Sequence, residues 1–178
     1  TSDIDMTSIS DWAPVNTENK AKNIVFDGAN HKISGFKCTN KTYTSLFGLI
    51  SGTVKNLVID SPVVTNTAQL GVLATWLGNS NGSLKAEVSN VHVISASVSM
   101  TGTGAAAVGG IAANCGASVV KGCSVSANIT HGCTGGSWNY VGGVIGKAFA
   151  TGTTISACSF NGSIEATAKK GYGFGGIL

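Results

Sequence analysis

The sequence predicts an all-β protein, a right-handed parallel β-helix of roughly five coils joined by irregular loops. Three observations predict this fold: a glycine phrase that returns along the chain, an apolar pattern that follows it, and a composition poor in charge. A single repeat cannot bury its apolar face alone, so neighbouring repeats must stack.

The glycine phrase is clearest in "YVGGVIG" and returns in shorter or altered form elsewhere. Aligned on its second glycine, the phrase gives the pairs Gly109-Gly110, Gly142-Gly143 and Gly175-Gly176, with the single glycines Gly48 and Gly71 at the same position. The unequal intervals favour a coil with variable loops over a helical solenoid. Recurrent glycine indicates a position where backbone passes close to backbone or where φ is positive.

A second pattern follows each glycine: an apolar residue, two others, an apolar residue, one other, and an apolar residue, as in "VVKGCSVSANI". The alternation and the β-branched residues predict strands. Stacking then predicts two interior ladders, Leu57-Val91-Cys123-Cys158 and Ile59-Val93-Val125-Phe160. The stretch "NIVFDGANHKISGF" predicts two short strands around a turn. We expect residues 1–178 to form a single β-helix domain, with residues 1–40 as a partial first unit and 41–178 as the repeats.

Composition narrows the class of protein. Hydrophobic residues make up 43% of the chain and charged residues 11%, and all the basic residues are scattered lysines that give a net charge of +3. Nucleic-acid binders cluster their basic residues and use arginine, so we expect no nucleic-acid partner. No apolar run approaches the roughly 20 residues of a membrane span. A surface of Ser, Thr, Asn and Gly favours an extracellular protein.

The phrases "YVGGVIGKAFATGTTISACSFNGSI" and "AVGGIAANCGASVVKGCSVSANI" resemble GLUG-motif repeats, and "TSDIDM", "DWAPVN" and "IVFDGANHKISGF" resemble the unit that often precedes such repeats. The resemblance covers nearly the whole chain, although Phe47 and Leu70 replace the first glycine of the pair in the first half. It implies a bacterial secreted or surface-anchored protein of the adhesin type. Similar repeats occur in immunoglobulin A-specific peptidases outside the catalytic part, so the motif implies a scaffold and not a ligand.

An enzyme is the alternative, because parallel β-helices also host polysaccharide lyases and glycoside hydrolases. A hydrolase needs a carboxylate pair, but Asp3 and Asp5 are the only acidic residues close together, and they read as edge residues. Stacking of Asp27 on Asp60 is the remaining route to a carboxylate pair. A β-helical lyase would be expected to use arginine or lysine as its base, and this chain has no arginine. The three histidines have no metal-ligand spacing. We therefore expect no catalytic residues, no metal and no cofactor.

The five cysteines leave two interpretations open. Cys123 and Cys158 occupy one repeat position, where they are either small core hydrophobes or a disulfide between neighbouring rungs. Cys115 and Cys133 flank one coil and could pair across it. None has the spacing of a redox motif.

Aromatic side chains in polar loops are the candidate ligand-binding residues, namely Trp76, Trp138 and Tyr140, with Trp12 as a further candidate. A ring beside amides suits a sugar, whose apolar face stacks on the ring while its hydroxyls bind the amides. The same rings could equally cover loop ends. Four Thr-x-Thr pairs raise ice binding as a third function, although they fall out of register with the glycines: Thr42/Thr44, Thr65/Thr67, Thr101/Thr103 and Thr151/Thr153.

These observations predict a non-enzymatic, extracellular module for adhesion or surface binding on a bacterial cell surface. Its expected partner is a host surface glycan or protein, or neighbouring repeats of the same array. Both ends of the chain stop inside the repeat, and bare solenoid ends recruit other chains. We therefore expect the chain to be a piece of a longer array or to have its ends covered by a partner.

Overall fold

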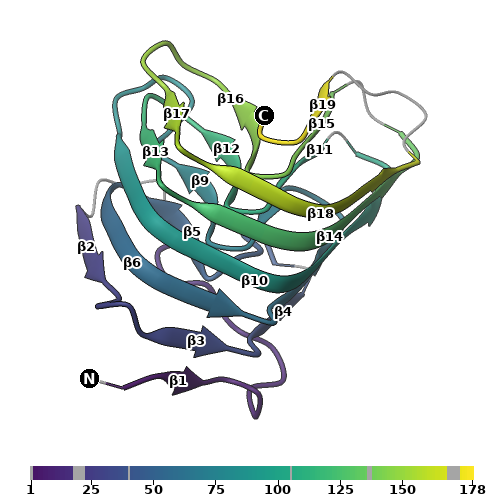
Figure 1. The fold of residues 1–178 in the computed structure, drawn as a ribbon. Coiled ribbons are helices and arrows are strands. Elements are labelled where there is room, and N and C mark those ends of the chain that lie inside the picture. Colours follow the sequence, from purple (N-terminus) through teal and green to yellow (C-terminus); the bar gives the residue numbers. More distant parts are fainter. Residues whose placement is uncertain (1, 18–22, 40, 105, 136–137, 168–172) are drawn as a thin grey trace.

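The chain winds into a right-handed parallel β-solenoid of about five turns (Figure 1). The computed structural model describes residues 2–17, 23–39, 41–104, 106–135, 138–167 and 173–178. Within these ranges the regular elements are strands, there is no helix, and every strand pair is parallel. The fold predicted from the repeats is therefore confirmed.

Three sheets run along the solenoid, each built from one strand segment of successive coils. Sheet A has 11 strands and is the broad curved sheet that faces the viewer in Figure 1. Its strands are β1 (Ile4–Asp5), β2 (Ile24–Asp27), β3 (Lys32–Ser34), β4 (Lys37–Thr39), β6 (Gly52–Asp60), β7 (Val63–Asn66), β10 (Ala86–Gly102), β13 (Val119–Lys121), β14 (Ser124–Cys133), β17 (Thr154–Ser156) and β18 (Ser159–Ala166).

Sheets B and C have four strands each and close the coils behind sheet A. Sheet B consists of β5 (Phe47–Ile50), β9 (Ala74–Leu77), β12 (Ala112–Cys115) and β16 (Ile145–Ala148). Sheet C consists of β8 (Leu70–Gly71), β11 (Ala106–Gly109), β15 (Asn139–Gly142) and β19 (Gly173–Gly175). In each coil the chain passes from sheet C to sheet B and then along sheet A.

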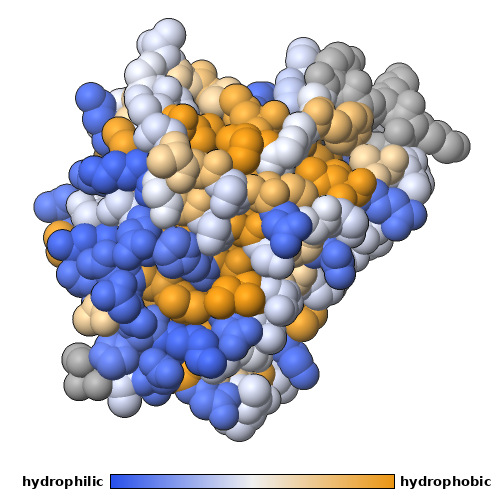
Figure 2. Space-filling model, viewed as in Figure 1, coloured by the Kyte–Doolittle hydropathy of each residue, from blue (hydrophilic) through white to orange (hydrophobic). Residues whose placement is uncertain are grey.

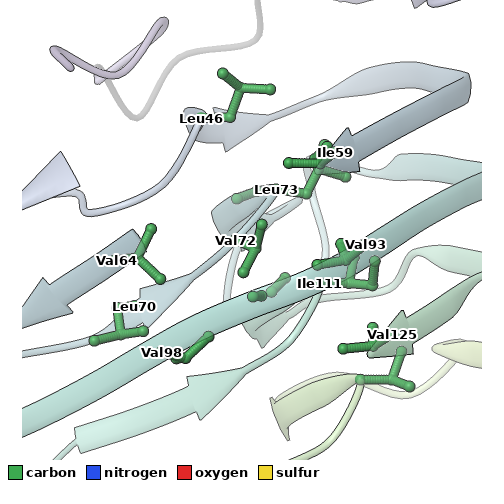
Figure 3. Close-up of a cluster of buried hydrophobic side chains, with 14 of the residues drawn as sticks. Leu46, Ile59, Val64, Leu70, Val72, Leu73, Val93, Val98, Ile111 and Val125 are labelled. Atoms are coloured by element: carbon green, nitrogen blue, oxygen red, sulfur yellow. The ribbon is translucent and has the colours of Figure 1, made fainter. Parts of the chain in front are cut away.

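The core is made of apolar ladders, as the repeat predicts. Val93 pairs with both Ile59 and Val125, and Val125 pairs with Phe160, which confirms the second predicted ladder. Figure 3 shows these valines and isoleucines pointing into the same interior as Leu73 and Ile111 from the corner of sheets C and B. Stacking like on like leaves little space between rungs, so the coils are held together by dispersion and burial of apolar surface.

Apolar surface is distributed unevenly along the axis. Figure 2 shows hydrophilic residues gathered over the first coils and apolar residues toward the end that carries β16–β19. At that end Ile155, Phe160 and Ile164 continue the interior ladders but are only partly buried, because they lie in the last coil.

The glycine register differs from the alignment made on sequence. Gly71 pairs with Gly109, the first glycine of its phrase, and not with Gly110. Gly48 lies in β5 of sheet B, between residues that pair with Ala74 and Trp76, so it corresponds to Thr75. The sequence alignment misplaced Gly48 and Gly71 because "LFG" and "LGV" both combine leucine with glycine. In the structure, these glycines stand at different places relative to the corner between sheets C and B.

Candidate functional site

The glycine pairs form a sharp corner between sheets C and B. A side chain at Gly109 would overlap the carbonyl oxygen of Ala112, and one at Gly110 would strike the side chain of Val125. A side chain at Gly142 would likewise overlap the carbonyl oxygen of Ile145, and one at Gly143 would overlap that of Gly176. Because neither face of the corner tolerates a Cβ, the backbone folds back tightly and brings the outer faces of the two sheets toward each other.

Two rows of outward side chains face each other across this corner. Sheet B contributes Leu49, Trp76, Asn114 and Lys147, which are neighbours in register. The other row consists of Gln69, which directly precedes β8, and of Ala107 and Tyr140 from sheet C, with Gly173 next in register. The rows touch: Asn114 Nδ2 donates to Gln69 Oε1, and Lys147 Nζ lies 4.5 Å from the ring centroid of Tyr140. We call the depression between these rows, with Tyr43, Trp138 and Phe149 at its edges, the axial groove.

The axial groove runs along the solenoid axis and crosses several coils. Leu49, Trp76, Asn114 and Lys147 occupy successive rungs, and rungs are about 4.8 Å apart, so this row is about 14 Å long. Tyr140 and Lys147 border two of its hollows. Trp76 and Leu49 line a third, which meets the others where the Trp76 ring packs on Phe149. A linear ligand parallel to the axis fits this shape better than a compact one.

Aromatic rings dominate the groove. The Trp76 and Phe149 rings pack with centroids 5.0 Å apart at an interplanar angle of 33°. Lys147 Nζ lies 4.1 Å from the centroid of Phe149 and 5.8 Å from that of Trp138, in addition to its contact with Tyr140. Trp138 is 55% exposed, so part of this aromatic surface is open to solvent.

Asn114 places an unusual polar group at the bottom of the groove. Its side chain is buried, with 0% of the residue exposed, and its Nδ2 also donates to the carbonyl oxygen of Thr75 at 3.3 Å. Its Oδ1 accepts no hydrogen bond from the described residues. A buried acceptor without a donor costs about 1–3 kcal/mol, so a ligand hydroxyl that reached this oxygen by displacing the side chains over it would recover that cost.

The structure brings together the three residues predicted as ligand-binding. Trp138 and Tyr140 line one hollow of the axial groove together with Phe149, and Trp76 packs on Phe149 and lines the neighbouring hollow. Trp76 lies in strand β9 and not in a loop. Trp12 lies elsewhere: its Nε1 donates to the carbonyl oxygen of Leu46 at 3.0 Å, and its ring packs against the core.

Sequence reasoning missed Gln69, Asn114, Lys147 and Phe149. A signal for two of them was present, because Trp76, Asn114 and Lys147 stand at one offset after Gly71, Gly109 and Gly142. The shifted glycine alignment hid that offset.

None of the described Asp and Glu side chains lines the groove, and most of them bind a lysine or the backbone of a turn. Asp27 is beside Lys55 in register and Asp60 is further along the same strand, so stacking does not bring the two carboxylates together. The backbone N–H of Ala29 lowers the pKa of Asp27, and the hydroxyl of Ser61 lowers that of Asp60, with help from Lys55 and Lys32 respectively. Within the described ranges no three His, Cys, Asp or Glu side chains gather as metal ligands would.

The cysteines and His131 are core residues. All five cysteines are free thiols, and burial raises the pKa of Cys115 and of Cys123 to about 12. His131 is buried in β14 beside Met100 of the preceding coil, and neither ring nitrogen has a hydrogen-bond partner among the described residues. Desolvation lowers its pKa, so the ring is neutral at physiological pH.

Comparison with known proteins supports the fold alone. No family model matches the chain, so the resemblance to GLUG repeats stays a prediction. No curated protein matches it either. The chain is similar to a solved structure from Bacteroides ovatus, named as a candidate immunoglobulin A1 protease, with 19% sequence identity and a TM-score of 0.54 over 99% of this chain and 76% of that one. In the described part of the chain, no helix is long and apolar enough to cross a membrane.

Proposed function

We propose that this chain is a non-enzymatic carbohydrate-binding module of a secreted or surface-anchored bacterial protein, and that the axial groove is its binding site. The observation that carries the proposal is the pairing of open aromatic rings with a buried, unpartnered amide oxygen in one depression. Sugars present an apolar face and a rim of hydroxyls, and this groove offers a partner for each.

The aromatic part of the groove is suited to stacking. Trp138 and Tyr140 come from one coil and Trp76 from an earlier one, so a saccharide chain along the axis would meet rings at both ends. Between them, Asn114 Oδ1 would accept a hydrogen bond from a hydroxyl and relieve its own unsatisfied state.

A hydrolase or lyase is the runner-up, and the groove supports it less. Its described lining residues include no Asp or Glu, whereas a glycosidase uses two carboxylates on either side of the scissile bond. Ice binding is supported less again, because Thr65 pairs with Ser99 and not with Thr101, and Thr44 is buried.

A glycan array tests the proposal. The chain is screened beside Trp138→Ala and Trp76→Ala, with Val25→Ala and Ile94→Ala as controls at exposed apolar positions outside the groove. We expect binding that both tryptophan variants weaken at least about tenfold, the loss of one stacked ring, and that the controls retain. Thermal unfolding of each variant separates lost binding from lost structure, since Trp76 also packs on Phe149. Failure of the wild type to bind any glycan on the array would overturn the proposal.

A further inference from the structure

Lys147 is the only charged side chain among the described residues that line the axial groove. It projects from β16 and its Nζ lies within 6 Å of three ring centroids, those of Phe149, Tyr140 and Trp138. Cation–π attraction holds the ammonium group above these rings and fixes a positive charge on the aromatic surface where the ligand would lie.

The charge of Lys147 is not neutralised by the protein in the way that other lysine charges are. Lys32, Lys41, Lys55 and Lys121 each lie within 4.0 Å of a carboxylate. No described carboxylate lies within that distance of Lys147 Nζ, although the side chain is half-buried. Lys37 and Lys85 also lack a carboxylate, but both are exposed to water, which solvates their charge.

A partly desolvated ammonium group gains more from an anion than an exposed one does, because the surroundings screen the pair less. The described side chains that line the groove include no Asp or Glu to repel an anionic ligand. The Lys147 charge therefore favours the approach of anions to this part of the groove.

Asn114 is the register neighbour of Lys147 across one rung, so their backbones are about 4.8 Å apart along the axis and both side chains line the same hollow. Asn114 offers an acceptor, Oδ1, and Lys147 offers a donor. A sugar unit with a hydroxyl beside an anionic substituent matches this pair, with the hydroxyl on Asn114 and the anion on Lys147.

We propose, resting on the function proposed above, that the ligand of the axial groove is an acidic saccharide whose carboxylate or sulfate binds Lys147 while its ring stacks on the tryptophans. The anionic group is what the site recognises, and the sugar framework sets how it reaches Lys147.

The test compares acidic glycans with neutral counterparts of the same backbone. An array carries oligogalacturonate with its carboxyl-reduced form, sialylated glycans with their desialylated forms, and sulfated glycans with their desulfated forms. Titration calorimetry then measures the best pair against wild type, Lys147→Met, Lys147→Arg and Lys85→Met. The Lys85 variant removes the same charge from an exposed site outside the groove, and methionine at 147 keeps the apolar bulk over the rings.

We expect the acidic member to bind at least about tenfold more tightly than its neutral partner, and this preference to weaken at high salt. Lys147→Met should remove the preference, whereas Lys147→Arg and Lys85→Met should keep it. Preference for carboxylated or for sulfated glycans identifies the anion, and either supports the inference.

Equal binding of acidic and neutral glycans, or an acidic preference unchanged by Lys147→Met, would overturn the inference and leave the proposed function standing. If no member of any pair binds, the proposed function is wrong and the inference fails with it.

Discussion

Asn90 donates a hydrogen bond from Nδ2 to Oδ1 of Asn56, 2.9 Å away on the preceding coil. Both residues have positive φ, 52° and 54°, and they sit where sheet A bends. Asn30, Gly122 and Ala157 have the same conformation at the corresponding position of the other coils, so a left-handed residue recurs at this bend. Gly35, Ser61 and Ser95 form a second series of left-handed residues further along the sheet. Asparagine tolerates this conformation better than other non-glycine residues, and here its amide also links the rungs.

The first prediction concerns this ladder. Asn90→Ala should lower the free energy of unfolding by about 2 kcal/mol, because it combines strain at positive φ with loss of the hydrogen bonds to Asn56 and His92. Asn90→Gly removes these hydrogen bonds without the strain and should cost about half as much. Urea denaturation measures both. Equal losses in the two variants would show that the backbone conformation contributes nothing.

Ala157 is the member of the same series that fits worst, with φ of 50° on an exposed turn between β17 and β18. Ala157→Gly should raise the free energy of unfolding by about 0.5 kcal/mol, since relief of left-handed strain exceeds the extra entropy of glycine in the unfolded chain. Ala166→Gly in β18 is the control and should lower stability. A loss in both variants would contradict the strain argument.

The sequence predicted the fold well because ladders repeat at the level of single residues. The order Leu57, Val91, Cys123 and Cys158 follows from one apolar position per coil, and the pairing of Val91 with Leu57 agrees with it. The bend escaped prediction, because Asn56 and Asn90 lie inside continuous strands and only their φ angles mark the turn.

The groove could be predicted only in part. Trp76, Trp138 and Tyr140 were found one by one as aromatic side chains in polar surroundings. Their common location depends on how sharply the chain folds between sheets C and B, which is a matter of backbone geometry at the glycines. Lys147 reads as an ordinary surface lysine until the corner places three rings around it.

That corner gives a third prediction. Gly142→Ala should lower the free energy of unfolding by about 3 kcal/mol, because the added methyl group would overlap the carbonyl oxygen of Ile145. Gly104→Ala is the matched control, since a Cβ there has no heavy atom within 4 Å. Thermal unfolding compares the two. If Gly142→Ala is as stable as Gly104→Ala, the corner is not held by close backbone approach.

The reactivity of the cysteine thiols gives a fourth prediction. The pKa of Cys115 and of Cys123 is raised to about 12 by burial, so almost no thiolate forms at pH 8, and neither sulfur is open to reagent. Native protein treated with a disulfide reagent should therefore react first at Cys158, the one cysteine that is not fully buried. Denatured protein should release all five. Fast native reaction at Cys115, located by peptide mapping, would contradict the packing.

The fifth prediction concerns His131. Its folded pKa is lowered by desolvation, whereas in the unfolded chain it has an ordinary value of about 6.5. The unfolded state therefore binds a proton that the folded state refuses, so stability is complete above about pH 7 and falls as pH drops through 6.5 toward the folded pKa. The carboxylates with lowered pKa, such as Asp11 and Asp27, lose their contribution only below about pH 4, in a separate window.

His131→Met should make the unfolding temperature independent of pH between 7 and 5, because methionine already fills the neighbouring rung at Met100 and takes no proton. His92→Gln is the control, since His92 binds Ser124 and Asn90 near the surface and its loss leaves His131 in place. Calorimetric scans across this range decide the matter. A wild type whose unfolding temperature does not fall toward pH 5 would mean that the interior opens to solvate the imidazolium at little cost.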